Sequence, residues 1–134
     1  TLTPSMAIHP DWKMAFGTMG GDQQDQWLSQ FILNVLVFGM SPQEAVEAPK
    51  ATTHHFPGTF YPHGERPGLL KLEGRIPQSV RDELASRGHE LEIEGDWSAG
   101  YICAAMRHES GVLEAAADFR GNACRAFPAT ALAR

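Results

Sequence analysis

The chain has 134 residues, of which 43% are hydrophobic and 20% charged, a composition typical of one globular domain. Its formal net charge is -5, with 11 Lys and Arg against 16 Asp and Glu and no basic cluster. It therefore lacks the positive surface that holds a nucleic-acid backbone. No apolar run approaches the roughly 18 residues that span a bilayer. These numbers predict one soluble domain over residues 1–134 that binds neither nucleic acid nor membrane.

The first part of the chain predicts a hairpin that is followed by a long helix. Residues 2–8 and 13–17 are short apolar runs separated by a turn that contains Pro and Asp. Residues 23–38 carry apolar side chains at helical spacing, which predicts a buried helix. Gly39 supplies the stop signal of that helix.

The remaining residues mix helices and strands. Ser41, Pro42 and Glu44 form the start signal of a second helix, which ends before Pro49. The later pattern predicts a strand at 51–55, a surface loop to 68, a strand at 69–73, a helix from 77 to 88, a strand at 91–93, and paired strands at 101–107 and 112–117. This order favours a layered α/β or α+β domain.

Gly20 and Gly21 stand where a predicted strand passes directly into the long helix. Glycines let a ligand approach the backbone closely, and the first N–H groups of a helix have no partner within it. Such a turn can act as an oxyanion hole, although a glycine pair is also common in tight turns. A phosphate cradle is disfavoured, because the GxxxxGK[ST] pattern is absent and Asp22 would repel a phosphate.

Five segments, in order and spacing, make the chain resemble the small subunit of the gamma-glutamyltranspeptidases. They are Thr1–Met6, Gly17–Gln24, Asn34–Gly39, Glu44–Pro49 and Glu114–Gly121. The resemblance covers nearly the whole chain and implies the C-terminal part of that subunit. It also implies an α+β fold that forms part of the four-layer αββα sandwich of N-terminal-nucleophile hydrolases.

In that family a precursor, or zymogen, cleaves itself autocatalytically and exposes a threonine that attacks a gamma-glutamyl amide. The resulting acyl-enzyme passes to water or to an amino acid. The resemblance implies that Gly20 and Gly21 donate backbone N–H bonds to the oxyanion. It places Thr1 in a hydroxyl pair that binds the substrate α-carboxylate, whereas a frayed terminus without a role is the alternative. Thr1 is not the nucleophile, because the family's nucleophile lies upstream of this segment.

The residues after the glycine pair bear on the substrate. Asp22, Gln23 and Gln24 resemble a branch of the family that includes oxamate amidohydrolases, whereas many glutathione-cleaving members carry a small hydroxyl residue there. Asp22 can bind a substrate amine, or it can only favour the helix N-terminus electrostatically. The substrate therefore stays open between glutathione, another gamma-glutamyl compound and a different small amide such as oxamate.

The resemblance implies a large subunit and the upstream part of the small subunit as partners, and no cofactor. Open strand edges would also favour association of copies of the chain. His54, His55 and His63 fit a surface loop better than a metal site, because no acidic residue has matching spacing. Cys103 is interpreted as a small core residue. A disulfide from Cys103 to Cys124 stays open, as does the compartment, with the cytoplasm favoured over the periplasm.

A second hypothesis is a non-catalytic fragment or interaction module that keeps the fold without activity. Under the enzyme hypothesis we expect the 134-residue chain alone to be inactive, because its nucleophile lies outside it.

Overall fold

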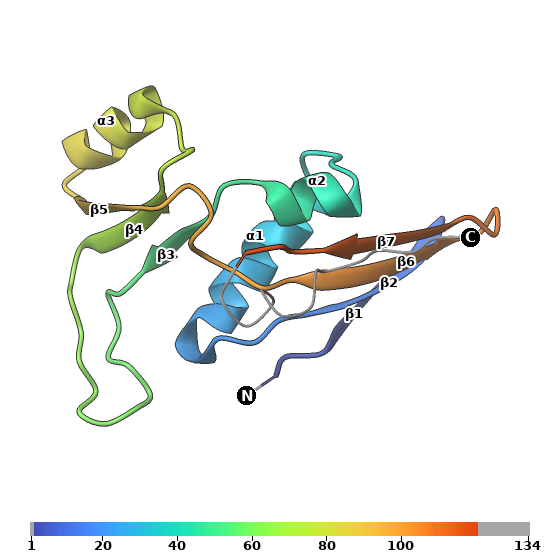
Figure 1. Ribbon diagram of the computed structural model, residues 1–134, viewed down its shortest axis with the longest axis horizontal. Helices are drawn as coiled ribbons and strands as arrows, with labels where there is room; N and C mark the ends of the chain where they lie inside the picture. The colour runs from blue at the N-terminus through green and yellow to red at the C-terminus, as the bar shows by residue number, and fades with distance from the viewer. Residues whose placement is uncertain (1, 121–134) are drawn as a thin grey trace. The chain divides into compact units, whose positions relative to one another are not determined.

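The computed structural model describes residues 2–120, which combine helices and β-sheet in two compact units (Figure 1). Among the described residues, the first unit contains 2–48 and 100–120, and the second contains 49–99. The second unit is thus inserted between two parts of the first. None of the described helices is both long and apolar enough to cross a membrane.

The first unit is built on an antiparallel four-stranded sheet with the order β1-β2-β6-β7 (Figure 1). Its strands are β1 (Ser5–His9), β2 (Trp12–Gly17), β6 (Cys103–His108) and β7 (Leu113–Ala117). The predicted hairpin is confirmed, with the Pro10 and Asp11 turn between β1 and β2. The predicted pair of late strands is confirmed as β6 and β7, and Gly111 lies in their turn at a φ of 90°.

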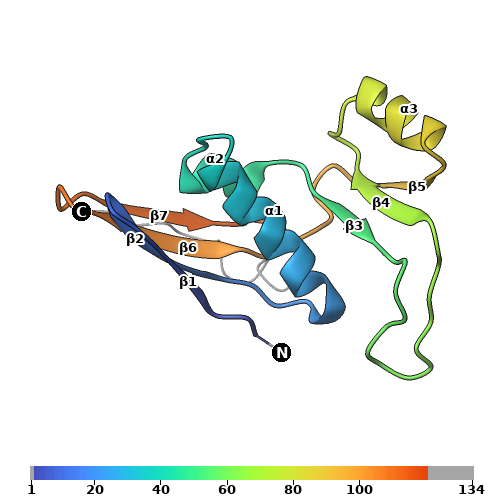
Figure 2. The same cartoon turned by 180° about the vertical axis from the view of Figure 1, so that it is seen from behind.

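Two helices cover one face of this sheet (Figure 2). They are α1 (Gln24–Leu36), entered through a 3-10 turn at Gly21–Gln23, and α2 (Pro42–Glu47). Met14, Phe31 and Met106 are almost fully buried on this face, where the Phe31 ring lies 5.3 Å from that of Phe16. The hydrophobic core of the unit therefore lies between α1, α2 and the sheet.

The predicted start of α2 is confirmed as a capping box. The Ser41 hydroxyl accepts a bond from the Glu44 N–H, and the Glu44 carboxylate accepts from the Ser41 N–H. The Ser41 hydroxyl also donates to the Glu44 carboxylate at 2.7 Å, and this bond, together with the bond from the Ser41 N–H, lowers the pKa of the exposed Glu44 carboxyl. Pro42 occupies the first turn, so the boundary follows from local chemistry alone.

The C-terminal end of α1 departs from the predicted buried helix. The helix ends at Leu36, and Phe38 is 69% exposed, although Gly39 supplies the expected left-handed stop at a φ of 67°. Trp27 and Phe31, nearer the start, are buried as expected. The apolar stripe therefore continues beyond the first part of α1, which is packed against the sheet, to residues that no described side chain buries.

The other face of the sheet is largely apolar, apart from Lys13 and Arg107, and it carries no helix among the described residues. Met6 and Ile8 are 69% and 74% exposed, and Ala105 is exposed at the centre of β6. Cys103 points to the same face and is exposed, so its interpretation as a core residue is wrong. Side chains along β6 alternate between the two faces of the sheet, so Ala104 and Met106 occupy the buried face and Cys103 the exposed one.

The second unit contains a three-stranded sheet and one helix. Its strands are β3 (Ala51–Thr53), β4 (Leu69–Glu73) and β5 (Glu90–Glu94), and its helix is α3 (Gln78–Ser86). β3 and β4 are antiparallel, whereas β4 and β5 are parallel and α3 connects them. The predicted strand at 69–73 is confirmed, and β3 is shorter than predicted.

A buried carboxylate holds the second unit together where the chain enters and leaves it. Glu73 is fully buried, and its Oε1 accepts bonds from the N–H groups of Ser98 and Ala99 at 3.0 and 3.1 Å. Its Oε2 accepts from the Lys50 N–H at 3.1 Å and from Arg75 at 3.0 Å. Four donors from three segments thus compensate for burying the carboxylate.

A second buried ion pair fastens the end of α2 in the first unit. Asp118 and Arg120 are 2% and 1% exposed, and their side chains pair at 2.8 Å. The Arg120 guanidinium also donates to the carbonyls of Val46, Glu47 and Ala48 at 2.6, 2.9 and 3.0 Å. It therefore satisfies carbonyls that the last turn of a helix leaves without partners.

We expect Asp118→Asn to lower the free energy of unfolding by about 3 kcal/mol, because it leaves the buried Arg120 charge without its counterion. Chemical denaturation of the purified full protein measures the loss. Asp82→Asn makes the same change at an exposed position on α3 and should cost less than about 0.5 kcal/mol. Equal stability of the two variants would show that the ion pair does not hold the α2 end.

Candidate active site

The glycine pair forms a turn that only glycine can adopt. Gly20 has φ 134° and ψ 24°, and Gly21 has φ 61°, both outside the range that other residues favour. The Trp27 ring lies directly against Gly20, so that a Cβ on Gly20 would come within 2.4 Å of a ring carbon. Both the backbone conformation and the packing therefore exclude a side chain at this position.

The carbonyls along the turn are held by hydrogen bonds. The Met19 carbonyl accepts from the Thr18 hydroxyl at 3.0 Å, and the Gly20 carbonyl accepts from the Gln23 N–H at 3.4 Å. The Gly21 carbonyl accepts from the Gln24 amide at 2.9 Å. In a trans peptide the C=O and N–H groups point in opposite directions, so these bonds also fix the directions of the N–H groups.

The N–H groups of the glycine pair are available to a ligand. Gly20 is exposed and Gly21 is half-buried at the start of the 3-10 turn that leads into α1. Among residues 2–120, neither glycine N–H donates a hydrogen bond. Two adjacent donors at the positive end of a helix can stabilise negative charge on an oxygen atom.

The segment that begins the chain lies beside this turn. Leu2 forms a β-bridge with Met19, and the Thr3 N–H donates to the Thr18 carbonyl at 3.1 Å. The Thr3 hydroxyl donates to the Gln24 side-chain oxygen at 2.5 Å. Thr1, expected to bind the substrate carboxylate, lies outside the described residues, so its role stays a prediction.

An open, mostly apolar cavity of about 320 Å³ borders the turn. It is lined by residues 2–4 and 17–19 together with Tyr101 and Cys103. The Tyr101 ring meets the Trp27 ring edge-on, with 5.9 Å between their centroids. The same tryptophan thus supports both the glycine turn and one wall of the cavity.

Asp22 follows the pair as an exposed residue in the first turn of the 3-10 segment. This position suits an acidic side chain electrostatically, and it also places a carboxylate next to the glycine N–H groups. The two interpretations of Asp22, a ligand for a substrate amine or a stabiliser of the helix start, both fit this position. Its role in substrate binding stays a prediction.

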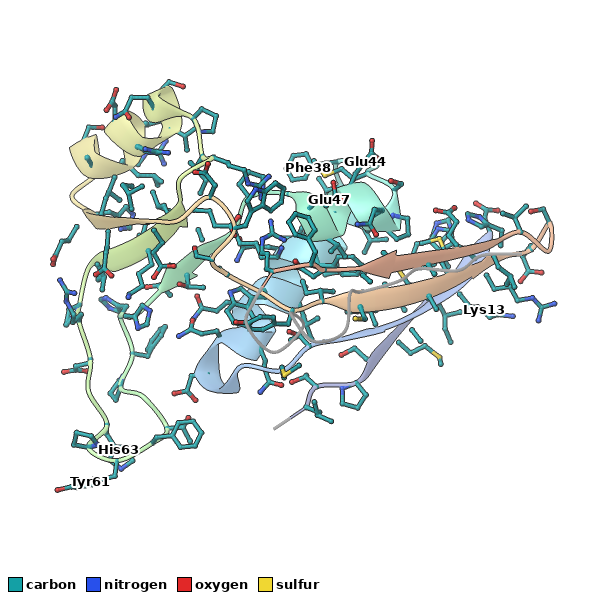
Figure 3. All side chains as sticks on the ribbon, viewed as in Figure 1. Lys13, Phe38, Glu44, Glu47, Tyr61 and His63 are labelled. Atoms are coloured by element: carbon teal, nitrogen blue, oxygen red, sulfur yellow. The ribbon has the colours of Figure 1, made fainter. Side chains whose placement is uncertain are left out.

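The histidines lie in the loop between β3 and β4, in the second unit. Figure 3 shows His63 with Tyr61 at the far end of this loop. His55 accepts a bond from the Gly68 N–H at 3.1 Å, and His63 lies 2.8 Å from the Gly58 carbonyl through its Nδ1 atom. Across residues 2–120, no group of three or more His, Cys, Asp or Glu side chains is arranged to hold a metal ion.

The sequence reasoning assigned no role to Gln24, which joins the first segment to the glycine turn. Gln24 is 7% exposed and occupies the buried stripe of α1 with Trp27, Leu28 and Phe31. A polar residue at a helical position otherwise filled by apolar side chains is a signal that could have identified it.

The chain is similar to known proteins along almost its whole length. The family model "Gamma-glutamyltranspeptidase" matches residues 1–127. The chain is 33% identical over 129 residues to the oxamate amidohydrolase proenzyme of Klebsiella pneumoniae, covering 94% of this chain and 23% of the relative. It is 32% identical over 125 residues to the glutathione hydrolase-like YwrD proenzyme of Bacillus subtilis, covering 91% of this chain and 23% of the relative.

A solved structure, that of LmbA2991HD, superimposes with a TM-score of 0.83 at 41% identity, covering 98% of this chain and 23% of that one. The chain thus spans less than a quarter of the length of each of these proteins. By the extent of the family match and the identity to these relatives, the chain belongs to the gamma-glutamyltranspeptidase family.

Proposed function

We propose that this chain supplies the oxyanion hole and part of the substrate pocket of a self-processing amide hydrolase or gamma-glutamyl transferase. The observation that carries the proposal is the glycine pair at the start of α1, beside an open cavity. Neither glycine N–H donates a hydrogen bond within the described residues. Membership of a family whose curated relatives are proenzymes supports it.

The reaction begins when the hydroxyl of an N-terminal threonine, from polypeptide upstream of this chain, attacks the amide carbon of the substrate. The free amine of that threonine accepts the hydroxyl proton and passes it to the leaving amine. Negative charge appears on the carbonyl oxygen, which accepts hydrogen bonds from the N–H groups of Gly20 and Gly21. Water or an amino acid then attacks the same carbon, which transfers the acyl group to it and breaks the ester bond, and the threonine oxygen takes back a proton.

The fixed turn makes these donors effective. The carbonyls of Met19 and Gly20 share peptide groups with the Gly20 and Gly21 N–H groups, and they already accept bonds from Thr18 and Gln23, so these peptide groups need not reorient as charge develops. One such donor contributes about 3 kcal/mol to transition-state stabilisation.

The uncovered face of the four-stranded sheet is where the upstream part of the small subunit packs. An apolar depression of about 290 Å³ lies on this face, between residues of β1, β2, β6 and β7. Met6, Ala15, Ala105 and Ala115 align across the four strands by their register. A second sheet from the upstream small subunit packs on this row, which completes the four-layer αββα sandwich, and the large subunit assembles around it.

The substrate is a small amide, and the two relatives define the alternatives. One is named an oxamate amidohydrolase and the other glutathione hydrolase-like. Asp22 favours a substrate that carries an amine, such as the α-amine of a gamma-glutamyl compound, because its side chain is exposed near the donors. A small substrate without an amine, such as oxamate, would leave Asp22 with only its role at the helix start.

Intact-mass measurement and a substrate panel test this proposal on the full precursor. We expect two processed subunits, and turnover of at least one compound among gamma-glutamyl amides, oxamate and acylated amines. A precursor that neither cleaves itself nor turns over any of them would favour the non-catalytic module instead.

Gly20→Ala tests the oxyanion hole directly. We expect kcat/KM to fall about 100-fold or more, because the new methyl group meets the Trp27 ring and displaces the donors. Gly39→Ala is the matched control, since Gly39 also has a positive φ, lies at the other end of α1 and has open space around it. Mass spectrometry establishes that both variants are processed, and equal kcat/KM values in the processed variants would exclude the role of Gly20.

A further inference from the structure

We infer that Gln24 is a positioning residue, which sets the direction of the glycine turn through one hydrogen bond and holds the first segment of the chain to it through another. This inference rests on the proposed function, because it assigns Gln24 a role in the same oxyanion hole. It adds a residue that touches neither the substrate nor the reacting atoms.

The Gln24 carboxamide lies between two segments that are distant in the sequence. Its oxygen accepts the bond from the Thr3 hydroxyl at 2.5 Å, and its nitrogen donates to the Gly21 carbonyl at 2.9 Å. Thr3 is separately fixed by its N–H bond to the Thr18 carbonyl at 3.1 Å. The Gln24 side chain therefore connects the first segment to the start of α1, and the Thr3 backbone connects that segment to Thr18, just after β2.

The bond to Gly21 has a direct consequence for the site. The Gly21 carbonyl belongs to the peptide group that follows the glycine pair, so holding this carbonyl fixes ψ of Gly21. Gly21 has a φ of 61°, and a glycine can leave this conformation for others at little energetic cost. Without the Gln24 amide, the peptide between Gly21 and Asp22 can rotate, and the turn that carries the Gly21 N–H loses one of the bonds that hold its shape.

Helix stability alone does not account for this side chain. Gln24 shares the buried stripe with Trp27 and Leu28, where an apolar residue would pack without burying an amide. Its two ends match their partners in type, because the oxygen faces a hydroxyl donor and the nitrogen faces a carbonyl acceptor. A glutamate has the same length, but when ionised it cannot donate to Gly21.

Three variants of the full, processed enzyme test the inference. Gln24→Met removes both bonds, and we expect kcat to fall between about 10-fold and 100-fold with KM little changed. Gln30→Met is the matched control, since Gln30 lies on the same helix and its amide donates to the Gln26 carbonyl within that helix. Gln24→Glu supplies a readout that a structural role would not give, namely a pH profile.

When the introduced carboxyl is protonated, it can again donate to Gly21 and accept from Thr3. The kcat of Gln24→Glu relative to the parent should therefore rise as the pH falls through the pKa of that carboxyl. Each pH series uses one folded sample of Gln24→Glu or of the parent, so the pH dependence of the ratio does not depend on how well Gln24→Met folds. A pH-independent ratio would overturn the inference, as would a Gln24→Met kcat equal to that of Gln30→Met.

The link to Thr3 is tested by a double-mutant cycle with Thr3→Val. If Thr3 acts through Gln24, Thr3→Val in the Gln24→Met background should lower kcat no further, and Thr3→Ser should keep the parent kcat. Additive losses would overturn the link. An active parent with unaffected Gln24 variants refutes the inference and leaves the proposed function standing, whereas an inactive parent refutes both.

Discussion

The contact between the Trp27 ring and the backbone of Gly20 is the constraint on which the candidate site depends. The ring occupies the space that a Cβ would need, so this position must be glycine. Glycine in turn allows the positive φ of the turn at the start of α1. The same ring meets Tyr101 at the wall of the adjoining cavity. Helix, strand end and cavity are thus positioned by one side chain, which the packing of α1 on the sheet keeps buried.

Much of the local structure could be predicted because its causes are local. Ser41 with Glu44 specifies a capping box, Gly39 specifies a left-handed stop, and the turn at Pro10 and Asp11 separates two apolar runs that pair as strands. The glycine pair was identified as a strand-to-helix turn on the same basis, and its position at the start of α1 is confirmed. Each of these signals acts over a few residues, so no knowledge of the tertiary arrangement was needed.

The parts that could not be predicted depend on contacts between distant segments. Cys103 sits in an apolar strand, but only the sheet register shows that it faces away from the helices. Phe38 follows the helical period of α1, yet nothing described covers it. Gln24 lies in the family-like segment Gly17–Gln24, but the role proposed for its side chain follows only from the simultaneous proximity of Thr3 and Gly21. Exposed apolar faces of this kind are expected in a chain that spans less than a quarter of its relatives.

The most direct test is a crystal structure of the full, processed protein with its nucleophilic threonine trapped as a tetrahedral adduct of a substrate analogue. The account predicts that the adduct's oxyanion lies about 2.7–3.1 Å from the backbone nitrogens of both Gly20 and Gly21. An adduct whose oxygen is bound by other groups, with the two glycine N–H groups hydrogen-bonded inside the protein, would contradict it.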